Sequence, residues 1–339
     1  MNLVQLFEGI MKKKTASIKD VASLANVSIA TVSRYLHGQL NRMSAETADQ
    51  VKNAIVKLNY VPNAAARQLI THKSKMIAII VVNIADSFST ELYKGANSVL
   101  ERAGYATVML DTDSQQAKEK QLINMVGLNT YDGLILQPLS SDVAKIKSEV
   151  RRDLPIVILD RQLKDSPWPQ VISENFAASK KAAQYFYQHG FTKAIVFSSA
   201  IAIASTRQKR LKGIKAVYPQ VTIFELDEKM LQHKEIFAKL EKILAEKAEK
   251  TVLFFLEERW LLLFLPDLIH ANLLPNKNIE ISGFADSSLI SSIWPSAKMI
   301  LQDPYKMGQK AGAIMLNLLA NKQNVPHTSM VKTSFIKKD

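Results

Sequence analysis

The sequence predicts an all-α helix-turn-helix head at the N-terminus, followed by an α/β core of two doubly wound parallel-sheet lobes. Three observations support this fold class. Short amphipathic helical patterns with capping residues fill residues 17–59, apolar β-branched runs alternate with helical stretches after Lys75, and positive charge is concentrated in the first quarter of the chain. With 339 residues, 47% of them hydrophobic, the chain has room for two or three domains that each bury a core.

The first two helices of the head are defined by their caps. Ser17 and Asp20 form a capping box at the start of a helix over about residues 18–25. After a tight turn, Ser28 caps a second helix that ends near Gly38. Apolar residues at helical spacing give each helix one inward face.

A third helix opens at Ser44 and ends at Asn59, a residue suited to the left-handed position after a helix. Three amphipathic helices, the first two joined by a short turn, describe a helix-turn-helix domain over residues 17–61. Residues 1–75 carry 11 Lys and Arg against 4 acidic residues, which is more than half of the chain's net charge of +13. We therefore expect the head to bind a phosphate backbone.

Parallel sheets covered on both faces are predicted for the rest of the chain. Strands without polar alternation, separated by amphipathic helices such as residues 89–103 and 177–189, are typical of doubly wound folds. Seven or more such units exceed one sheet, so we expect two lobes with a ligand cleft at the carboxyl ends of their strands. The expected strands are residues 76–82, 106–110, 133–136, 156–159, 194–197, 252–256 and 279–284.

Composition and motifs exclude several classes of protein. The chain has no cysteine, which rules out disulfide scaffolds and cysteine nucleophiles. No apolar run reaches the about 18 residues that a membrane helix needs, and residues 1–10 lack the order of a secretory signal, with Met11 as an alternative start. No dinucleotide, phosphate-loop or zinc-protease motif is present, so we expect no enzyme and no cofactor or metal.

Residues 17–38 (SIKDVASLANVSIATVSRYLHG) and 60–69 (YVPNAAARQL) resemble the start of a LacI/GalR-family bacterial transcription regulator. The resemblance implies a dimeric, cytoplasmic repressor whose paired heads read a pseudo-palindromic operator. It also implies a core, similar to periplasmic sugar-binding proteins, that closes on a small effector. Looser matches follow in the family's order at residues 132–138, 158–161, 174–175, 210–213, 283–286 and 302–308.

For the head, the resemblance implies that the second helix reads DNA. Arg34 is suited to a bidentate contact with a guanine edge, whereas Ile29 and Ala30 offer apolar contact only. Polar residues beside them are suited to phosphate contacts that set the register. The DNA-binding residues expected in the head are Ser28, Ile29, Ala30, Thr31, Ser33 and Arg34. Asn63, directly after Pro62, is expected to contact DNA as well.

Residues 62–70 resemble the family's hinge helix, which lies in the minor groove and forms when two copies meet on DNA. Pro62 presets the first turn, and small residues including Ala66 let two such helices approach closely. Leu69 matches the apolar wedge that unstacks the central base step. Without the flanking match, an Ala-rich stretch with one Leu would be interpreted as a core helix.

These patterns divide the chain into four parts. Residues 1–16 form an N-terminal tail, 17–61 the helix-turn-helix domain, 62–73 the hinge helix and linker, and 74–339 the effector-binding and dimerisation core. Within the core, lobe one is expected to take about residues 74–171 and 300–325, and lobe two about residues 172–299 and 326–339.

The resemblance also implies an effector site in the cleft of the core. Arg210 falls on the family's Arg-x-x-Gly effector position, with Arg207 one helical turn before it, and Arg161 ends a buried strand. Phe88 and Trp260 fit ligand contact and core packing equally well. The expected effector-binding residues are Phe88, Ser89, Gln137, Arg161, Arg207, Arg210, Glu258, Trp260 and Asp286.

Two departures from the family shape the expected ligand and assembly. The carboxylate that grips sugar hydroxyls is replaced by Ala285, with Asp286 one residue later. Because guanidinium groups pair best with carboxylates or phosphates, we expect a sugar acid or a sugar phosphate as effector. Glu257 and Glu258 are suited either to bind ligand hydroxyls or to pair with the arginines. A neutral sugar or a nucleobase-type ligand is therefore the alternative effector. The chain shows no heptad tail, so we expect a dimer rather than a tetramer.

Two other classes of protein are the remaining alternatives. A solute-binding protein would share the two-lobed core but would need a signal peptide and no basic head. An architectural DNA-binding protein would not need so large a core. The head and the core together favour a regulator whose partners are operator DNA, a small effector and a second copy of the chain, with no membrane partner.

Overall fold

The computed structural model describes residues 16–36, 38–61, 73–128, 131–150, 152–227, 232–245 and 249–336. The chain forms two compact units, residues 1–74 and residues 75–339, and each is described by itself. Within the described ranges, no helix has the length and apolar character that crossing a membrane requires.

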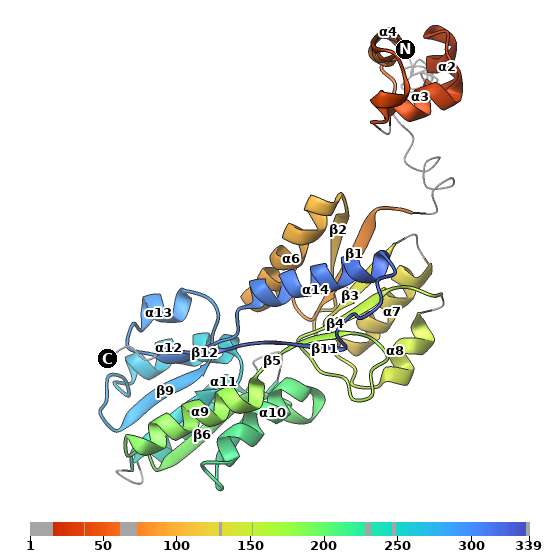
Figure 1. Cartoon of the computed structure of the whole chain (residues 1–339). Coiled ribbons are helices and arrows are strands. Elements are labelled where there is room, and N and C mark those ends of the chain that lie inside the picture. The colour runs from red at the N-terminus through yellow and green to blue at the C-terminus, as the bar shows by residue number, and fades with distance from the viewer. Residues whose placement is uncertain are drawn as a thin grey trace, which may run out of the picture. The chain divides into compact units, whose positions relative to one another are not determined.

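The described part of the first unit is a helix-turn-helix domain (Figure 1). Its core is built from one valine of each α-helix: Val21, Val32 and Val51 are fully buried in one cluster. The three predicted helices are therefore confirmed. They are α2 (Ile18–Leu24), α3 (Ile29–Leu36) and α4 (Ala45–Lys57), with a short 3-10 helix, η1 (Leu40–Arg42), between the last two.

The helix ends of this unit follow the predicted caps. The Asp20 N–H donates to the Ser17 hydroxyl, and the Asp20 carboxylate accepts from the Ser17 N–H at 2.7 Å, which completes the capping box. The Ser44 hydroxyl accepts from the Thr47 N–H at 3.1 Å. Asn59 has a φ of 46°, the left-handed conformation expected after α4.

The second unit contains two six-stranded sheets, as predicted for a two-lobed α/β core (Figure 1). The first sheet has the order β11 (Thr328–Val331), β5 (Gln170–Ser173), β4 (Ile156–Leu159), β3 (Gly133–Leu136), β1 (Met76–Val81), β2 (Ala106–Asp111). The second has the order β12 (Ser334–Phe335), β10 (Lys298–Leu301), β9 (Ile279–Phe284), β8 (Thr251–Phe255), β6 (Lys193–Ser199), β7 (Thr222–Leu226). The strands are parallel except for β12, which runs antiparallel to β10.

Helices cover both faces of the first sheet. Ile77 and Ile79 of β1 pack under α6 (Ser87–Leu100) and α14 (Pro304–Leu319), whereas Ala78 and Ile80 face α7 (Gln116–Leu128) and α8 (Val143–Glu149). Successive strand residues point to opposite faces, and here both faces are buried. This explains why the strand is an unbroken apolar run.

The second sheet is built in the same way. One face packs against α11 (His233–Ala245) and α12 (Glu258–His270), and the other against α9 (Asn175–Gln188) and α10 (Ser205–Lys215). Phe197 and Phe255 of neighbouring strands stack with their ring centroids 4.6 Å apart. The remaining short elements are α13 (Leu289–Ile293), η2 (Glu101–Ala103) and η3 (Ile201–Ile203).

Within the described residues, the chain passes between the two sheets three times: after β5, between β10 and α14, and between β11 and β12. This corrects the expected lobe boundaries. Residues 328–331 are expected in lobe two from the sequence, but β11 pairs with β5 in the first sheet. The expected boundaries after residue 171 and before residue 300 each cut through a strand, because residues 170–173 all pair in the first sheet and residues 298–301 all pair in the second.

Candidate functional sites

The outer face of α3 is the candidate nucleic-acid surface of the first unit. Ser28 caps this helix by accepting a hydrogen bond from the Thr31 N–H at 3.1 Å, and Val32 anchors it in the core. Arg34, two residues further along, is exposed on the opposite side. An exposed guanidinium on a helix anchored from behind is suited to reach a guanine edge. Of the other expected residues, Ser28, Ile29 and Ala30 are exposed, and Thr31 and Ser33 are half-buried.

The predicted hinge helix lies outside the described residues. Asn63, Ala66 and Leu69 belong to this segment. The DNA contacts expected of them therefore stay predictions.

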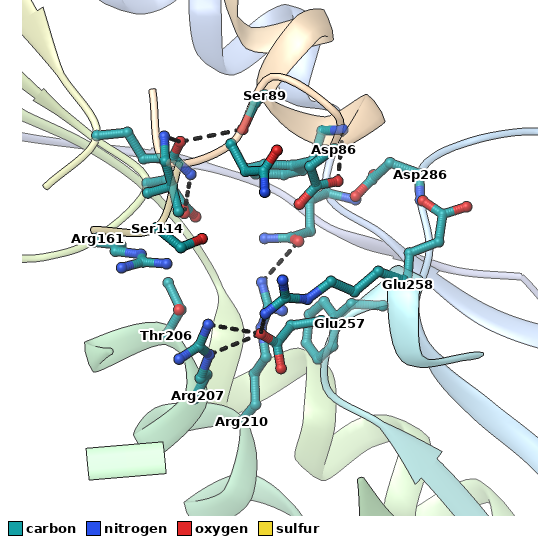
Figure 2. A pocket seen from close by; sticks show the side chains of 18 residues that line it. Asp86, Ser89, Ser114, Arg161, Thr206, Arg207, Arg210, Glu257, Glu258 and Asp286 are labelled. Carbon is teal, nitrogen blue, oxygen red and sulfur yellow. Dashed lines mark hydrogen bonds and ion pairs between the residues drawn. The ribbon is translucent and has the colours of Figure 1, made fainter. Parts of the chain in front are cut away.

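A cavity in the second unit is lined by residues at or after the carboxyl ends of strands from both sheets (Figure 2). Parallel strands bring their carboxyl ends to one edge of a sheet, where open α/β folds bind their ligands. Eight of the nine expected effector residues line this cavity: Phe88, Ser89, Gln137, Arg161, Arg207, Arg210, Glu258 and Asp286.

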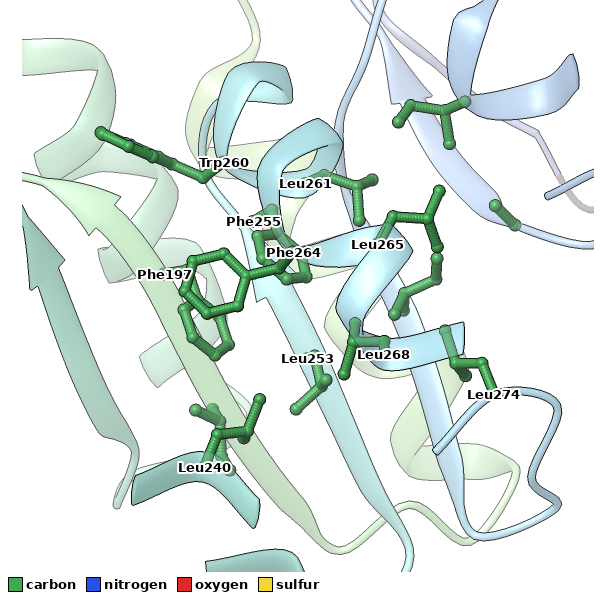
Figure 3. Close-up of a cluster of buried hydrophobic side chains, with 14 of the residues drawn as sticks. Phe197, Leu240, Leu253, Phe255, Trp260, Leu261, Phe264, Leu265, Leu268 and Leu274 are labelled. Atoms are coloured by element: carbon green, nitrogen blue, oxygen red, sulfur yellow. The ribbon is translucent and has the colours of Figure 1, made fainter. Parts of the chain in front are cut away.

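Trp260 is the exception, and its expected contact with an effector is corrected. Its side chain is fully buried in the hydrophobic cluster that α12 forms with the second sheet, where Figure 3 shows it near Phe264 and Leu261. The indole Nε1–H donates to the Ser199 hydroxyl at 3.0 Å, so the polar edge of the ring is satisfied inside the protein. Trp260 therefore supports the wall of the cavity without lining it.

Asp160 and Arg161 form one end of the cavity. Asp160 has a φ of 67° directly after β4, and both of these consecutive side chains line the cavity. Gln137 Nε2 donates to Asp160 Oδ2 at 3.0 Å, and Arg161 Nη1 donates to the Pro138 carbonyl at 3.4 Å. Within the described residues, Asp160 Oδ1 and Arg161 Nε are buried and have no hydrogen-bond partner. Burial, and next the charge of Arg207, lower the pKa of Arg161 to about 10.

Arg207 is already paired inside the protein. Its Nε and Nη2 lie 2.9 and 2.7 Å from Oε1 of Glu257. Glu257 also accepts from the Ser199 N–H at 2.9 Å and lies 3.5 Å from Arg259 Nη2. Burial by itself would raise the pKa of Glu257, but Arg207, Arg259 and the hydrogen bonds from Ser199 outweigh it and hold the pKa at about 2.

Arg210 is engaged by three acceptors of the protein. Its Nε donates to Asn175 Oδ1 at 2.7 Å, its Nη2 donates to Gln302 Oε1 at 2.8 Å, and its Nη1 donates to the Leu256 carbonyl. The guanidinium also lies 3.7 Å from the centroid of the Phe284 ring. Gln302 in turn donates to the Ser173 hydroxyl at 2.7 Å, so Arg210 belongs to a network that joins the two sheets. Of the three expected effector arginines, Arg161 has the most hydrogen-bonding capacity left.

The other end of the cavity is acidic. Figure 2 shows Asp86, Glu258 and Asp286 on the side away from Arg161. Glu258 Oε2 accepts from the N–H groups of Asp286 and Ser287 at 3.1 and 3.2 Å. Burial raises the pKa of Asp286 to about 7, although its Oδ1 accepts from two N–H groups.

The position of Asp286 corrects one premise of the sequence analysis. Ala285 is buried in the hydrophobic core, whereas Asp286 lines the cavity. A carboxylate is therefore present in the cavity after all, supplied by the next residue. Arg161, and not a missing negative charge, is the feature of the cavity that favours an acidic ligand.

Ten of the lining residues were not among the nine expected effector contacts, although Glu257 was expected to bind hydroxyls or pair with an arginine. Half of them lie one or two positions after a strand, such as Asn83 after β1 and Asp160 after β4, so the carboxyl ends of the strands were the signal that could have found these five. The ten are Val82, Asn83, Asp86, Ser114, Asp160, Thr206, Glu257, Arg259, Phe284 and Gln302.

Comparison with known proteins assigns both units. Residues 17–63 match the family model described as bacterial regulatory proteins, lacI family. Residues 74–236 match the model described as periplasmic binding proteins and sugar binding domain of LacI family. Together the two matches span more than half of the chain. The chain belongs to the LacI family.

Relatives and solved structures agree with this assignment. The LacI-family chain is 29% identical over 336 residues to the HTH-type transcriptional regulator KdgR of Bacillus subtilis, covering 96% of this chain and 98% of the relative. It is 28% identical to the ribose operon repressor of the same species, with coverages of 93% and 95%. A LacI transcriptional regulator from Lactobacillus brevis is 37% identical with a TM-score of 0.73, covering 77% of this chain and all of that structure. This LacI-family chain is therefore a DNA-binding transcription regulator.

The fold of nearly the whole LacI-family chain is found in the lac repressor. The structure of the lac repressor dimer bound to operator and an anti-inducer has a TM-score of 0.82 and 21% identity. The match covers 96% of this chain and 98% of that one. At this identity the likeness shows the shared fold alone.

Proposed function

We propose that this regulator represses transcription by binding a pseudo-palindromic operator as a homodimer, and that a small acidic carbohydrate bound in the cavity controls this binding. One observation supports an acidic ligand. Arg161 lines the cavity, is only 8% exposed, and keeps its Nε without a hydrogen-bond partner within the described residues. A buried guanidinium of this kind is best completed by an anion, through charge-assisted hydrogen bonds.

Two carboxylates of the cavity are already engaged by the protein and leave this preference in place. Glu257 is neutralised by Arg207 and Arg259. Glu258 is occupied by two main-chain N–H groups and by the Ser287 hydroxyl. Since the acidic end of the cavity lies away from Arg161, a ligand with an anionic group at one end and hydroxyls at the other complements both ends.

A neutral sugar is the second candidate. The relative named ribose operon repressor is named for a neutral sugar, and its match extends over the cavity-forming part of the chain. Asp86 and Asp286 would accept hydrogen bonds from its hydroxyls. This candidate leaves Arg161 without an anionic partner, so we place it second.

For DNA binding, the support comes from the first unit. Arg34 on α3 is the candidate reader of a guanine edge. Asn63, Ala66 and Leu69 remain the proposed contacts of a hinge helix with the minor groove. Dimer formation is supported by exposed apolar side chains on α13, where Leu289 is 52% and Ile293 48% exposed.

The test combines DNA binding with ligand binding on the full-length chain. Gel shifts on the DNA that flanks the chain's own gene should show specific binding that weakens as salt is raised. Calorimetry against gluconate, 2-keto-3-deoxygluconate, glucose 6-phosphate, ribose and galactose should show binding of an acid, and that acid should change the gel shift. Arg161→Met should weaken its binding at least about tenfold, whereas Arg102→Met, on an exposed helix end, should not. Binding of a neutral sugar alone, unaffected by Arg161→Met, contradicts the proposed ligand class.

A further inference from the structure

Two unpartnered polar atoms lie next to each other in sequence at one end of the cavity. Asp160 is 5% exposed and Arg161 is 8% exposed, and both line the cavity. Within the described residues, Oδ1 of Asp160 lacks a donor and Nε of Arg161 lacks an acceptor. Buried polar groups are normally hydrogen-bonded, so this end of the cavity is suited to a ligand that supplies both partners.

The backbone explains why both side chains reach the same cavity. Successive residues of a strand point to opposite faces of the sheet. Asp160 leaves this pattern because its φ of 67° turns the chain at the end of β4. An aspartate tolerates this left-handed conformation better than most residues. An acceptor and a donor are thereby presented from neighbouring positions.

The second oxygen of Asp160 is fixed independently of any ligand. Gln137 Nε2 donates to Oδ2 at 3.0 Å, and Gln137 Oε1 accepts from the Val82 N–H at 3.1 Å. The amide of Gln137 is therefore oriented by the backbone, and it holds the Asp160 carboxylate so that Oδ1 is the oxygen left for another donor. Oδ1 of Asp160 is therefore suited to accept a hydrogen bond from a hydroxyl or an N–H group of the ligand, and not to contact a second anion.

We infer that the effector carries a hydroxyl group on the carbon next to its carboxylate, with the carboxylate bound by Arg161 and the hydroxyl donating to Oδ1 of Asp160. This inference rests on the proposed function, because it takes the ligand to be a sugar acid. A carboxylate without the neighbouring hydroxyl would pair with Arg161 but would bring a second negative charge towards Asp160 with no proton between them. A 2-hydroxy acid supplies an anionic acceptor to Arg161 and a hydroxyl donor to Asp160 at the same time.

The remaining parts of the cavity fit the rest of such a ligand. Asp86 and Asp286 lie at the end away from Arg161, where they would accept hydrogen bonds from the distal hydroxyls of a polyhydroxy acid. The ligand is then oriented with its carboxylate at the end of β4 and its hydroxyl chain towards α6 and the end of β9.

The test is calorimetry of the full-length chain with gluconate and 2-deoxygluconate, which differ only in the hydroxyl next to the carboxylate. We expect 2-deoxygluconate to bind roughly 10- to 100-fold more weakly, because it leaves Asp160 Oδ1 buried without a donor. In Asp160→Asn, the amide oxygen keeps the contact with Gln137 and an N–H group replaces Oδ1. The ratio of the two affinities should then fall to within about threefold of one.

The matched control is Asp165→Asn, the same chemical change in the loop that follows the same strand. Asp165 is exposed and also has a positive φ, of 52°, so asparagine is tolerated at both positions. Its variant should keep the full preference for gluconate, and thermal melts should show all three proteins folded.

The outcomes separate the inference from the proposed function. Equal affinity of the unmodified chain for gluconate and 2-deoxygluconate overturns the inference and leaves the acidic effector standing. Binding of another acid with no measurable binding of gluconate also overturns the inference. If ribose or galactose binds and no acid does, both the inference and the proposed ligand class are wrong.

Discussion

Oε1 of Glu257 accepts hydrogen bonds from two nitrogens of Arg207, Nε at 2.9 Å and Nη2 at 2.7 Å. The two residues are separated by 50 positions in the chain, and their side chains are only 16% and 8% exposed. Glu257 sits between β8 and α12, and Arg207 lies on α10. The pair therefore ties two helices of the second sheet together at the wall of the cavity.

Removing the carboxylate of this pair should destabilise the protein. In Glu257→Ala, the guanidinium of Arg207 stays buried without its ionic partner, and breaking a buried pair from one side costs about 3 kcal/mol or more. We expect the free energy of unfolding, measured by chemical denaturation followed by circular dichroism, to fall by about this amount.

Glu91→Ala is the matched control for this prediction. Glu91 forms an ion pair of 2.6 Å with Lys94 on α6, but both side chains are exposed to solvent. Surface pairs contribute about 0 to 1 kcal/mol, so the control should change little. Equal effects of the two variants would show that the burial of the Glu257 pair has no energetic consequence.

The contact between α6 and α14 depends on a glycine. A Cβ placed on Gly308 would lie 2.0 Å from the carbonyl oxygen of Leu92, so the two helices cannot keep their spacing with any side chain there. Gly308→Ala should therefore lower the free energy of unfolding by about 1 to 3 kcal/mol. This is the opposite of the usual effect, because alanine normally stabilises a helix relative to glycine.

Gly312→Ala, one turn further along α14, is the graded control for that variant. Its Cβ would lie 3.0 Å from the carbonyl oxygen of Ala96, a contact that a small shift relieves. We expect a smaller loss of stability than for Gly308→Ala in the same denaturation experiment. A larger loss at Gly312 would contradict the packing argument.

Local signals explain how much of the fold could be predicted. The caps at Ser17 and Ser44 act within one turn of their helices, so sequence alone reveals them. Interior strands such as Ile156–Leu159 are buried on both faces and therefore appear as apolar runs. The edge strand β11 escaped prediction because Thr328 and Met330 are exposed, which breaks the apolar run. Its assignment to the wrong lobe followed from this.

The site was predictable in position, but of its pairing only a contact between Glu257 and an arginine was among the expectations. Strand ends can be located from the sequence, which is why residues such as Gln137 and Arg161 were found. The partners of a side chain depend on tertiary packing: nothing local shows that Arg210 would bond to Asn175, Leu256 and Gln302. The orientation of Trp260 likewise depends on how α12 rotates against the second sheet. Its apolar ring points to the core, where it is fully buried.

Arg34 should determine operator preference. Arg34→Ala removes the exposed guanidinium of α3 that is suited to a guanine edge, while Val32 keeps the helix anchored. We expect a loss of about 1 to 3 kcal/mol in discrimination between the operator and unrelated DNA, with the stability of the second unit and effector binding unchanged. Quantitative gel shifts with both DNAs measure this difference.

Lys57→Ala provides the comparison for Arg34. Lys57 is an exposed cation in the last turn of α4, in the same unit but on a different helix from Arg34. Losing one positive charge there should weaken binding to the operator and to unrelated DNA alike, if it changes binding at all. The proposed role of Arg34 fails if Arg34→Ala and Lys57→Ala give the same ratio of affinities.

Asp286 should make effector binding depend on pH near neutrality. Burial raises the pKa of this carboxyl to about 7, so it is largely protonated below pH 6 and largely ionised above pH 8. Ionisation adds a negative charge to the cavity, whereas the carboxylate of a sugar acid is already ionised throughout this range. The affinity for the tightest-binding carboxylic acid of the panel should therefore fall several-fold as the pH rises from 6 to 8.

Asp286→Asn tests whether this carboxyl is the group that titrates. The amide oxygen of asparagine still accepts from the N–H groups of Gln302 and Asp303, which donate to Asp286 Oδ1 at 2.5 and 3.2 Å, so the wall of the cavity should keep its shape. Calorimetry at pH 6, 7 and 8 should give a nearly constant affinity for the variant, close to the pH 6 value of the unmodified chain. The sign follows from the charge: a protonated or amidated side chain does not repel an anion, and an ionised one does. An affinity that still falls with pH in Asp286→Asn would show that another group controls the binding. A neutral sugar, which carries no charge to repel, should show much weaker pH dependence in both proteins.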